Sequence, residues 1–360
     1  MKILIIQQKM IGDVLTSSIL FEAIKLKYPD AELHYVINSH TYPVVEHNPF
    51  VDQFHFFTPQ HEKSKRQLYI FAKQLKKEKF DIVVDVYSKL SSNIISYISA
   101  AQTKISKYKW YTSFIYTHLI EEKDVSNTNA GLAIENRLLH LEPLGVNTSE
   151  IIKPKIYLTD TEKVEAKRFL ETNGIEISKP LYMIGVLGSG SAKTYPFEFM
   201  AHIIDRIIEQ QPKGQVLFNY IPNQIDDAKA IFNLCNEQTQ QQIHFDVFGK
   251  SLRDFLAITS FCDALIGNEG GAINMAKAID IPTFTIFSPW IQKEVWNIFD
   301  DGIRHVSVHL KDYDEAHYRS IKKFKALKSK SHALYTKFKP SYFETDLIDF
   351  LKRLNNSTSS

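Results

Sequence analysis

The chain has 360 residues, of which 44% are hydrophobic and 23% are charged, so its composition is that of a globular protein rather than a disordered or fibrous one. Because 43 Lys and Arg residues nearly balance 41 Asp and Glu residues, the net charge gives no general reason to bind nucleic acid. This length is enough for two domains of average size, each with its own core.

The N-terminus and the two cysteines indicate the compartment. Residues 2–6 are apolar, but the chain turns polar at Gln7, so a first strand is expected there rather than a secretory signal. No apolar run approaches the ~20 residues that span a bilayer. Cys235 and Cys262 lie in apolar surroundings and are expected to be buried in a reducing compartment. We therefore expect a cytoplasmic protein that could lie on the inner face of the cytoplasmic membrane.

The first half of the chain alternates short apolar runs with helical periodicity, which is typical of a doubly wound α/β sheet. The apolar runs predict strands at 2–6, 32–37 and 80–86. The helices predicted between them are 11–28, 44–47 and 67–77. Residues 107–129 are less regular and carry no predicted element.

The second half repeats this alternation after a helix predicted at 159–173, with Thr161 as its N-cap and Gly174 as its stop. The predicted strands are 181–186, 215–218, 244–247, 264–266 and 283–287. The predicted helices are 196–210, 225–237, 252–261, 272–279 and 342–354. We therefore expect a domain at 1–174, a second at 175–340, and a C-terminal helix with a frayed tail at 341–360.

Gly12 and Asp13 stand at the start of the first predicted helix, just beyond the first strand. Ligands of open α/β sheets gather at the carboxyl ends of strands, so Asp13 is placed to accept a proton from an attacking hydroxyl. The alternative is a first-turn aspartate that interacts with the helix dipole. No G-x-G-x-x-G motif follows the strand, which argues against hydride transfer.

Two glycine-containing loops precede helices in the second half. The loop at 188–194 offers backbone amides, hydroxyls and the Lys193 ammonium to a diphosphate. It is not a Walker A loop, because Ser191 stands where that motif requires lysine. The alternative is a glycine-serine turn without a ligand. The second loop, at 269–271, combines paired glycines with Glu269, which could hold sugar or ribose hydroxyls.

Motifs spread in order over residues 1–300 resemble glycosyltransferase family 9, the ADP-heptose:lipopolysaccharide heptosyltransferases. They lie at 2–15, 28–33, 47–52, 80–85, 193–196, 268–271 and 281–289. The resemblance implies a GT-B fold, in which two Rossmann-like doubly wound domains face a central cleft. It also implies that the N-terminal domain binds the acceptor and the C-terminal domain binds the nucleotide sugar.

The activity implied by the resemblance is an inverting transfer that needs no metal and no cofactor. The donor would be a nucleotide sugar, ADP-heptose, and the acceptor a lipopolysaccharide core or a related cell-envelope saccharide. Asp13 matches the family's catalytic base, and Lys193 matches the lysine that neutralises the donor diphosphate.

Other site residues follow from the same resemblance, with departures. The family's Asp-Thr-Gly motif is Glu269-Gly270-Gly271 in this chain, and its histidine is Asn274. Asp226 or Asp227 could hold the ribose. The expected donor-binding residues are Gly188, Ser189, Gly190, Ser191, Thr194, Asp226, Glu269, Gly270, Gly271 and Asn274, and the expected acceptor-binding residues are Gly12, Lys89 and Lys107.

The segment from Arg319 to Lys339 contains eight Lys or Arg, no Asp or Glu, and interleaved apolar and aromatic residues. It could rest on anionic lipid headgroups or on a phosphorylated acceptor saccharide, with its aromatic residues entering the interface. The alternative is a solvated helix face.

Two other functions stay open from the sequence. A nucleotide-sugar epimerase can share the two-domain scaffold and needs no acceptor. A non-catalytic saccharide- or nucleotide-binding relative is the second alternative, and the presence of both Asp13 and Lys193 argues against it.

Overall fold

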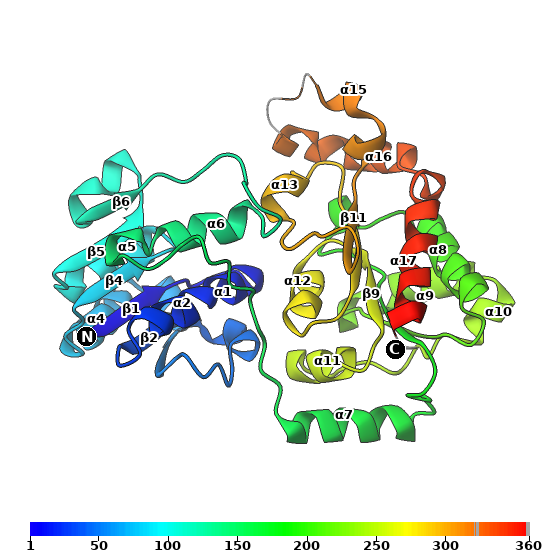
Figure 1. Cartoon of the computed structure of the whole chain (residues 1–360), viewed down its shortest axis with the longest axis horizontal. Coiled ribbons are helices and arrows are strands. Elements are labelled where there is room, and N and C mark those ends of the chain that lie inside the picture. Colours follow the sequence, from blue (N-terminus) through cyan, green and yellow to red (C-terminus); the bar gives the residue numbers. More distant parts are fainter. Residues whose placement is uncertain (320, 322–323, 358–360) are drawn as a thin grey trace. The chain divides into compact units, whose positions relative to one another are not determined.

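The computed structural model describes residues 1–319, 321 and 324–357. The chain divides into two compact units, Met1–Tyr157 (unit 1) and Leu158–Ser360 (unit 2). Each unit is built on its own parallel β-sheet with helices packed on it (Figure 1). The α/β fold class expected from the alternating pattern is therefore present in both units.

Unit 1 contains a six-stranded sheet in the order β3-β2-β1-β4-β5-β6. Strand β1 lies in its middle and pairs in parallel with both β2 and β4. Because both faces of β1 are covered, its residues from Ile3 to Ile6 are fully buried, which explains its continuous apolar run. The strands are β1 (Lys2–Ile6), β2 (Glu32–Asn38), β3 (Gln53–Phe57), β4 (Ile82–Asp85), β5 (Thr103–Lys107) and β6 (His118–Ile120).

The helices of unit 1 bury apolar faces against this sheet. Leu68, Phe71 and Leu75 of α4 pack in one cluster with Leu4 of β1 and Ile95 of α5. The helices are α1 (Ile11–Ser17), α2 (Ile19–Lys27), α3 (Pro59–Lys63), α4 (Lys65–Lys77), α5 (Leu90–Ser99) and α6 (Leu132–Leu139), with the 3₁₀ segments η1 (Ser39–Val44), η2 (Trp110–Ile115) and η3 (Glu142–Leu144).

Unit 2 contains a five-stranded parallel sheet in the order β11-β10-β9-β7-β8. The strands are β7 (Leu181–Gly185), β8 (Gln215–Phe218), β9 (Ala264–Asn268), β10 (Thr283–Ile286) and β11 (His305–Val308). Each sheet has a switch point, where the strands that follow in the chain are added on the opposite side of the first strand. It lies between β1 and β4 in unit 1 and between β7 and β9 in unit 2. Such switch points open a crevice at the carboxyl ends of the two strands, where ligands bind.

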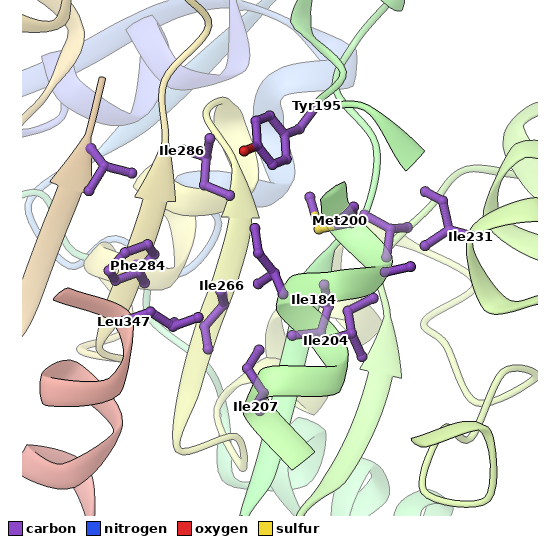
Figure 2. Close-up of a cluster of buried hydrophobic side chains, with 14 of the residues drawn as sticks. Ile184, Tyr195, Met200, Ile204, Ile207, Ile231, Ile266, Phe284, Ile286 and Leu347 are labelled. Carbon is purple, nitrogen blue, oxygen red and sulfur yellow. The ribbon is translucent and has the colours of Figure 1, made fainter. Parts of the chain in front are cut away.

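The core of unit 2 lies between this sheet and its covering helices (Figure 2). Ile204 and Ile207 of α8 pack in the same cluster as Ile184 and Ile266 of the central strands. Helix α17 contributes Leu347 to it, so the C-terminal helix belongs to the core of unit 2. The main helices are α7 (Asp160–Thr172), α8 (Phe197–Gln210), α9 (Ile225–Leu234), α11 (Leu252–Thr259), α12 (Gly271–Ala278), α16 (Ser331–Lys337) and α17 (Glu344–Ser357).

Short segments complete unit 2 between these helices. They are η4 (Ser191–Lys193), η5 (Pro222–Gln224), α10 (Glu237–Gln240), α13 (Lys293–Trp296), α14 (Leu310–Tyr313), α15 (Glu315–Tyr318), η6 (Phe324–Lys330) and η7 (Pro340–Tyr342).

Helix α7 belongs to unit 2, so the division after Tyr157 comes earlier in the chain than the boundary expected near residue 175. Two nitrogens of the Arg253 guanidinium on α11 each donate to the Glu162 carboxylate at 2.6 Å. These bonds, more than any other cause, lower the pKa of Glu162 to about 2.

Thr159, not Thr161, is the N-cap of the helix, and its hydroxyl accepts from the Glu162 amide.

Several other elements differ from the sequence prediction. Residues 244–247 form no strand, and only an isolated bridge joins Ile243 to Val216. The helix predicted at 44–47 is replaced by η1, which ends at Val44. The pattern also missed β3, β5, β6 and β11, as well as α5 and α6. The missed strands β3 and β6 have exposed or half-buried residues at most positions, so they lack the continuous apolar run that marks a central strand.

Candidate active site

Asp13 lies in the first turn of α1, at the carboxyl end of β1 and beside the switch point of unit 1. Its Oδ1 lies 2.6 Å from Nη2 of Arg137, and its Oδ2 accepts a hydrogen bond from the Met10 amide at 3.2 Å. The side chain of Asp13 is 29% exposed. The carboxylate is therefore held in a defined direction and still reaches solvent. Gly12 precedes it in the same turn.

Arg137 is a site residue that the sequence analysis missed. It lies on α6, where its Nε donates to Ser17 Oγ at 2.9 Å and its Nη1 donates to the Ala133 carbonyl at 2.7 Å. These two bonds fix the plane of the guanidinium, and its remaining nitrogen, Nη2, contacts Asp13. No sequence signal pointed to Arg137, because α6 was not predicted and the contact joins residues 124 positions apart.

A buried glutamate anchors the loop that leads into α6. Burial opposes ionisation of Glu135, but hydrogen bonds from Ser126, Asn127 and Thr128 to its Oε1 outweigh this effect and lower its pKa to about 2. The ionised carboxylate therefore ties residues 126–128 to the helix that carries Arg137.

A pocket of about 610 Å³ opens in unit 1, lined by residues that follow the carboxyl ends of β4 and β5. Lys89, an expected acceptor-binding residue, lines it, whereas Lys107 pairs with Glu122 at 3.4 Å and is not part of the lining. Lys109, which the sequence analysis did not select, also lines the pocket and donates to the Ser88 carbonyl. Burial, and then the nearby charges of Lys107 and Lys89, lower the pKa of Lys109.

Asp85 lies fully buried at the end of β4 and braces this pocket. It accepts hydrogen bonds from the Ser88 amide at 2.7 Å and from the Tyr116 hydroxyl at 2.6 Å. Burial raises the pKa of the Asp85 carboxyl. Since Ser88 precedes α5 and Tyr116 follows η2, Asp85 holds together the two segments that form the pocket.

In unit 2, Lys193 and Glu269 form an ion pair, with 2.9 Å between Nζ and Oε1. Lys193 follows β7 and Glu269 follows β9, so the pair joins the two glycine loops at the switch point between these strands. The Glu269 side chain is buried. Lys193 Nζ also lies over the Trp290 ring, 5.7 Å from its centroid, a cation–π contact that the sequence did not reveal.

The loop at 188–194 is closed by its own hydrogen bonds. The Thr194 hydroxyl accepts from the Gly188 amide at 3.1 Å and donates to the Gly190 carbonyl at 3.0 Å. A Cβ at Gly188 would lie 2.2 Å from the Lys193 carbonyl oxygen, so only glycine fits there. Ser189 and Ser191 are exposed on the loop.

The start of α9 is tied to the same loop by Gln224, whose Nε2 donates to the Gly188 carbonyl at 2.9 Å. Asp226 lies in the first turn of α9 and is exposed. Gln224 was not selected from the sequence, yet its hydrogen bond places this turn of α9 next to the expected diphosphate loop.

Asn268, at the end of β9, braces both loops. Its Oδ1 accepts from the Tyr195 amide at 2.8 Å, and its Nδ2 donates to the Gly185 carbonyl at 2.9 Å. The preceding Gly267 has φ 143°, and a Cβ there would lie 2.4 Å from the Gly185 oxygen. Gly270, Gly271 and Asn274 follow at the start of α12. The structure therefore brings the expected donor-binding residues together around β7, β9 and the start of α9.

Neither a metal centre nor a spanning helix is found in the part of the chain that the structure describes. No three His, Cys, Asp or Glu residues there are arranged to hold a metal ion. Within the same residues, every helix is too short or too polar to cross a membrane.

Residues 68–325 match the sequence profile of glycosyltransferase family 9 (heptosyltransferase). The chain belongs to this family. Lipopolysaccharide heptosyltransferase 1 of Campylobacter coli is 24% identical over 294 residues, which cover 80% of this chain and 84% of that protein. The match confirms that the protein is a glycosyltransferase, and it favours glycosyl transfer over the epimerase and the non-catalytic relative.

Two solved structures confirm the fold. The family 9 glycosyltransferase of Veillonella parvula superposes with a TM-score of 0.73 at 16% identity, over 93% of this chain and 97% of that one. The ADP-heptose lps heptosyltransferase II of E. coli gives 0.67 at 14% identity, over 94% and 99%. The expected fold of two Rossmann-like domains of the GT-B type is confirmed.

In the basic segment 319–339, several side chains expected at a lipid interface are buried. Lys322 and Lys323 lie outside the described residues. Two of the aromatic residues expected to enter the interface, Tyr335 and Phe338, instead lie in the core of unit 2, and the third, Phe324, is partly buried against this core. The exposed residues of the segment include the lysines 325, 328, 330, 337 and 339. As far as it is described, this segment therefore exposes mainly lysines, while Tyr335 and Phe338 are buried.

Proposed function

We propose that this glycosyltransferase transfers heptose from ADP-heptose to a lipopolysaccharide core or a related cell-envelope saccharide, with inversion and without a metal ion or cofactor. The ion pair of Lys193 and Glu269 between the two glycine loops is the observation that carries the proposal. The names of the relatives, which include lipopolysaccharide and ADP-heptose heptosyltransferases, support the choice of donor and acceptor.

The donor diphosphate would bind at the loops of unit 2. Lys193 supplies a positive charge, and the amides of residues 189–192 and of the start of α12 supply hydrogen-bond donors for phosphate oxygens. Glu269 holds the lysine in place and offers its second carboxylate oxygen to a sugar hydroxyl. Asp226 would accept from the ribose, and Asn274 would bind the sugar.

The acceptor would bind to unit 1. Gly12, which precedes Asp13 in α1, would lie beside the acceptor, and Lys89 and Lys107 would attract a phosphorylated saccharide. The Asp13 carboxylate accepts the proton of the acceptor hydroxyl while the hydroxyl oxygen forms a bond to the anomeric carbon of the donor.

The bond from the anomeric carbon to the diphosphate breaks in the same step, and ADP leaves. Attack on the face opposite the leaving group inverts the anomeric configuration. Lys193 and the loop amides stabilise the negative charge that develops on the diphosphate, a role that a metal ion fills in other enzymes. We place this reaction in the cytoplasm.

The proposal is tested with purified protein, ADP-heptose and a heptose-deficient lipopolysaccharide. We expect a product one heptose heavier by mass spectrometry, with inverted anomeric configuration by NMR, and the same rate in EDTA. Calorimetry with ADP, GDP and UDP should rank ADP as the tightest ligand. Rearrangement of the donor when no acceptor is present would instead support the epimerase, and loss of activity in EDTA that Mg²⁺ restores would rule out the metal-free mechanism.

A further inference from the structure

Large apolar side chains protrude from unit 1 around the mouth of its pocket. Trp110 and Phe114 of η2 are 76% and 78% exposed, and Leu90 at the start of α5 is 73% exposed. Tyr97 and Tyr111 are also more than half exposed. Leu90, Tyr97, Tyr111 and Phe114 all line the pocket, and the Trp110 ring lies 5.6 Å from that of Tyr111. We call these five residues the aromatic patch.

Hydrogen bonds on both sides of η2 fix the segment that carries most of the aromatic patch. On one side of η2, Lys109 donates to the Ser88 carbonyl at the start of the α5 segment. On the other side, the buried Tyr116 hydroxyl bonds both Asp85 and Asn93. Because both ends of η2 are attached to the β4–α5 region, the exposure of Trp110 and Phe114 is a property of the folded surface.

The sequence that carries the aromatic patch is rich in lysine. Between Val86 and Ile120 the sequence contains four lysines and no Asp or Glu. Lys89 and Lys109 line the pocket beneath the aromatic rings. Burial and then the charges of Lys107 and Lys89 lower the pKa of Lys109, and Lys107 itself pairs with Glu122. A partner for this surface must therefore be anionic as well as apolar.

Exposed aromatic rings beside lysines match the chemistry of a lipid bilayer surface. Trp and Tyr favour the headgroup level because one end of each ring system is apolar and the other is polar. Lysines near such a surface are attracted to its anionic headgroups. The basic segment 319–339 offers less aromatic surface, because Tyr335 and Phe338 lie in the core of unit 2 and Phe324 is half-buried.

We propose that the aromatic patch docks unit 1 on an anionic phospholipid bilayer, with Trp110 and Phe114 entering the interface and the neighbouring Lys109 attracting the headgroup phosphates. This contact does not depend on the identity of the transferred sugar. It places the peripheral membrane contact on a different surface from the basic segment in which the sequence pattern suggested it.

The experiment is sedimentation of the full chain with vesicles of phosphatidylcholine containing about 30% phosphatidylglycerol, compared with vesicles of phosphatidylcholine alone. We expect binding to the anionic vesicles that weakens as salt is added. The double variant Trp110→Ser/Phe114→Ser should reduce the partition coefficient by about tenfold or more, since both side chains contribute buried apolar area. Circular dichroism should be unchanged, because both side chains are mostly exposed.

The matched control is Trp296→Ser/Ile303→Ser, which removes two exposed apolar side chains from unit 2 and should leave vesicle binding unchanged. Equal partition of the wild type and the Trp110→Ser/Phe114→Ser variant would overturn the proposal. Self-association in light scattering without lipid, lost in the same variant, would overturn it too and show that the patch is a protein interface. Vesicle binding is measured without donor or acceptor, so its failure is separate from failure of the glycosyl transfer.

Discussion

Nη2 of Arg137 lies 2.6 Å from Oδ1 of Asp13, and this pair joins α6 to the first turn of α1. Arg137 is itself fixed by bonds to Ser17 and to the Ala133 carbonyl. The direction of the Asp13 carboxylate is therefore set by a second helix as well as by the Met10 amide at the start of its own helix. This relationship distinguishes a positioned carboxylate from one that only interacts with the helix dipole.

The substitution Asp13→Asn should remove the proton acceptor and keep the size of the side chain. We expect the transfer rate to fall by about 10²- to 10⁴-fold, the range that general base catalysis supplies. Affinity for ADP should stay unchanged, because the proposed nucleotide site is built from unit 2. Initial rates and calorimetry measure the two effects.

The control for this variant is Asp30→Asn, which alters an exposed carboxylate in the turn before β2 and should keep full activity. Full turnover by the Asp13→Asn variant would remove Asp13 from the mechanism.

Arg137 should act as a positioning residue. In the Arg137→Ala variant we expect kcat to fall by about 10- to 100-fold, because a small misplacement of a catalytic group has a large effect on rate. The KM for the acceptor should change little, and Arg137→Lys should restore part of kcat.

A double-mutant cycle with Asp13→Asn tests this role, because both changes act on one carboxylate. The combined loss should be close to that of Asp13→Asn alone. Fully additive losses would show that Arg137 acts on something other than Asp13.

The central strands and both glycine loops were predictable from the sequence for a physical reason. A parallel strand covered on both faces must be apolar throughout, as β1 and β7 are, and a helix that follows it closely needs a short polar loop. These local patterns were sufficient to select Asp13, Lys193 and Glu269 one by one.

The pairing of these residues was not predictable, because it depends on which strands are neighbours. Lys193 meets Glu269 since β9 lies next to β7 in the sheet, although β8 follows β7 in the chain. Arg137 meets Asp13 across the sequence for a similar reason. The aromatic patch also escaped notice, because a protruding Trp110 and a buried tryptophan look alike in sequence.

Because Lys193 and Glu269 form an ion pair, substitutions at the two residues should have non-additive effects on the affinity for ADP. Lys193→Ala should weaken ADP binding by about 10- to 100-fold, the size of one or two hydrogen bonds to a charged group. Part of this loss comes from the buried Glu269 carboxylate, which would then face the diphosphate without its cation. Adding Glu269→Gln should therefore recover some of the affinity of the Lys193→Ala variant.

Calorimetry with ADP on the single and double variants measures the coupling. The same affinity in Lys193→Ala as in the wild type would show that the 188–194 loop does not hold the diphosphate.

The close approach of the loop backbone at Gly188 predicts a difference between two neighbouring glycines. Gly188→Ala places a Cβ 2.2 Å from the Lys193 carbonyl oxygen, so the loop must move. We expect the free energy of unfolding to fall by about 1–3 kcal/mol, as for other overpacked sites, and ADP binding to weaken. A Cβ at Gly190 meets nothing within 4 Å, so Gly190→Ala should leave the free energy of unfolding within about 0.5 kcal/mol of the wild type. Equal stability losses in denaturant titrations of the two variants would contradict this account.

His140 predicts how the stability of the protein changes with pH. The imidazole is fully buried, its Nδ1 donates to the Asn136 carbonyl at 2.9 Å, and burial lowers its pKa to about 4 from the ordinary value of 6.5. Between these two values the unfolded chain binds the proton and the folded chain does not. The free energy of unfolding therefore falls as the pH decreases from 6.5 to 4, by up to about 1.4 kcal/mol per pH unit, and this contribution is constant above 6.5.

Replacing His140 by Phe removes the titrating group and keeps an aromatic ring in the space. Urea unfolding at pH 7.5 and at pH 5 gives the free energy of unfolding that is lost on acidification. This loss should be smaller in His140→Phe than in the wild type by roughly 1–2 kcal/mol. The exposed His332 gives the matched control, since His332→Phe should leave the pH dependence unchanged. If His140→Phe and the wild type lose the same stability on acidification, the imidazole is protonated in the folded protein and burial does not keep it neutral.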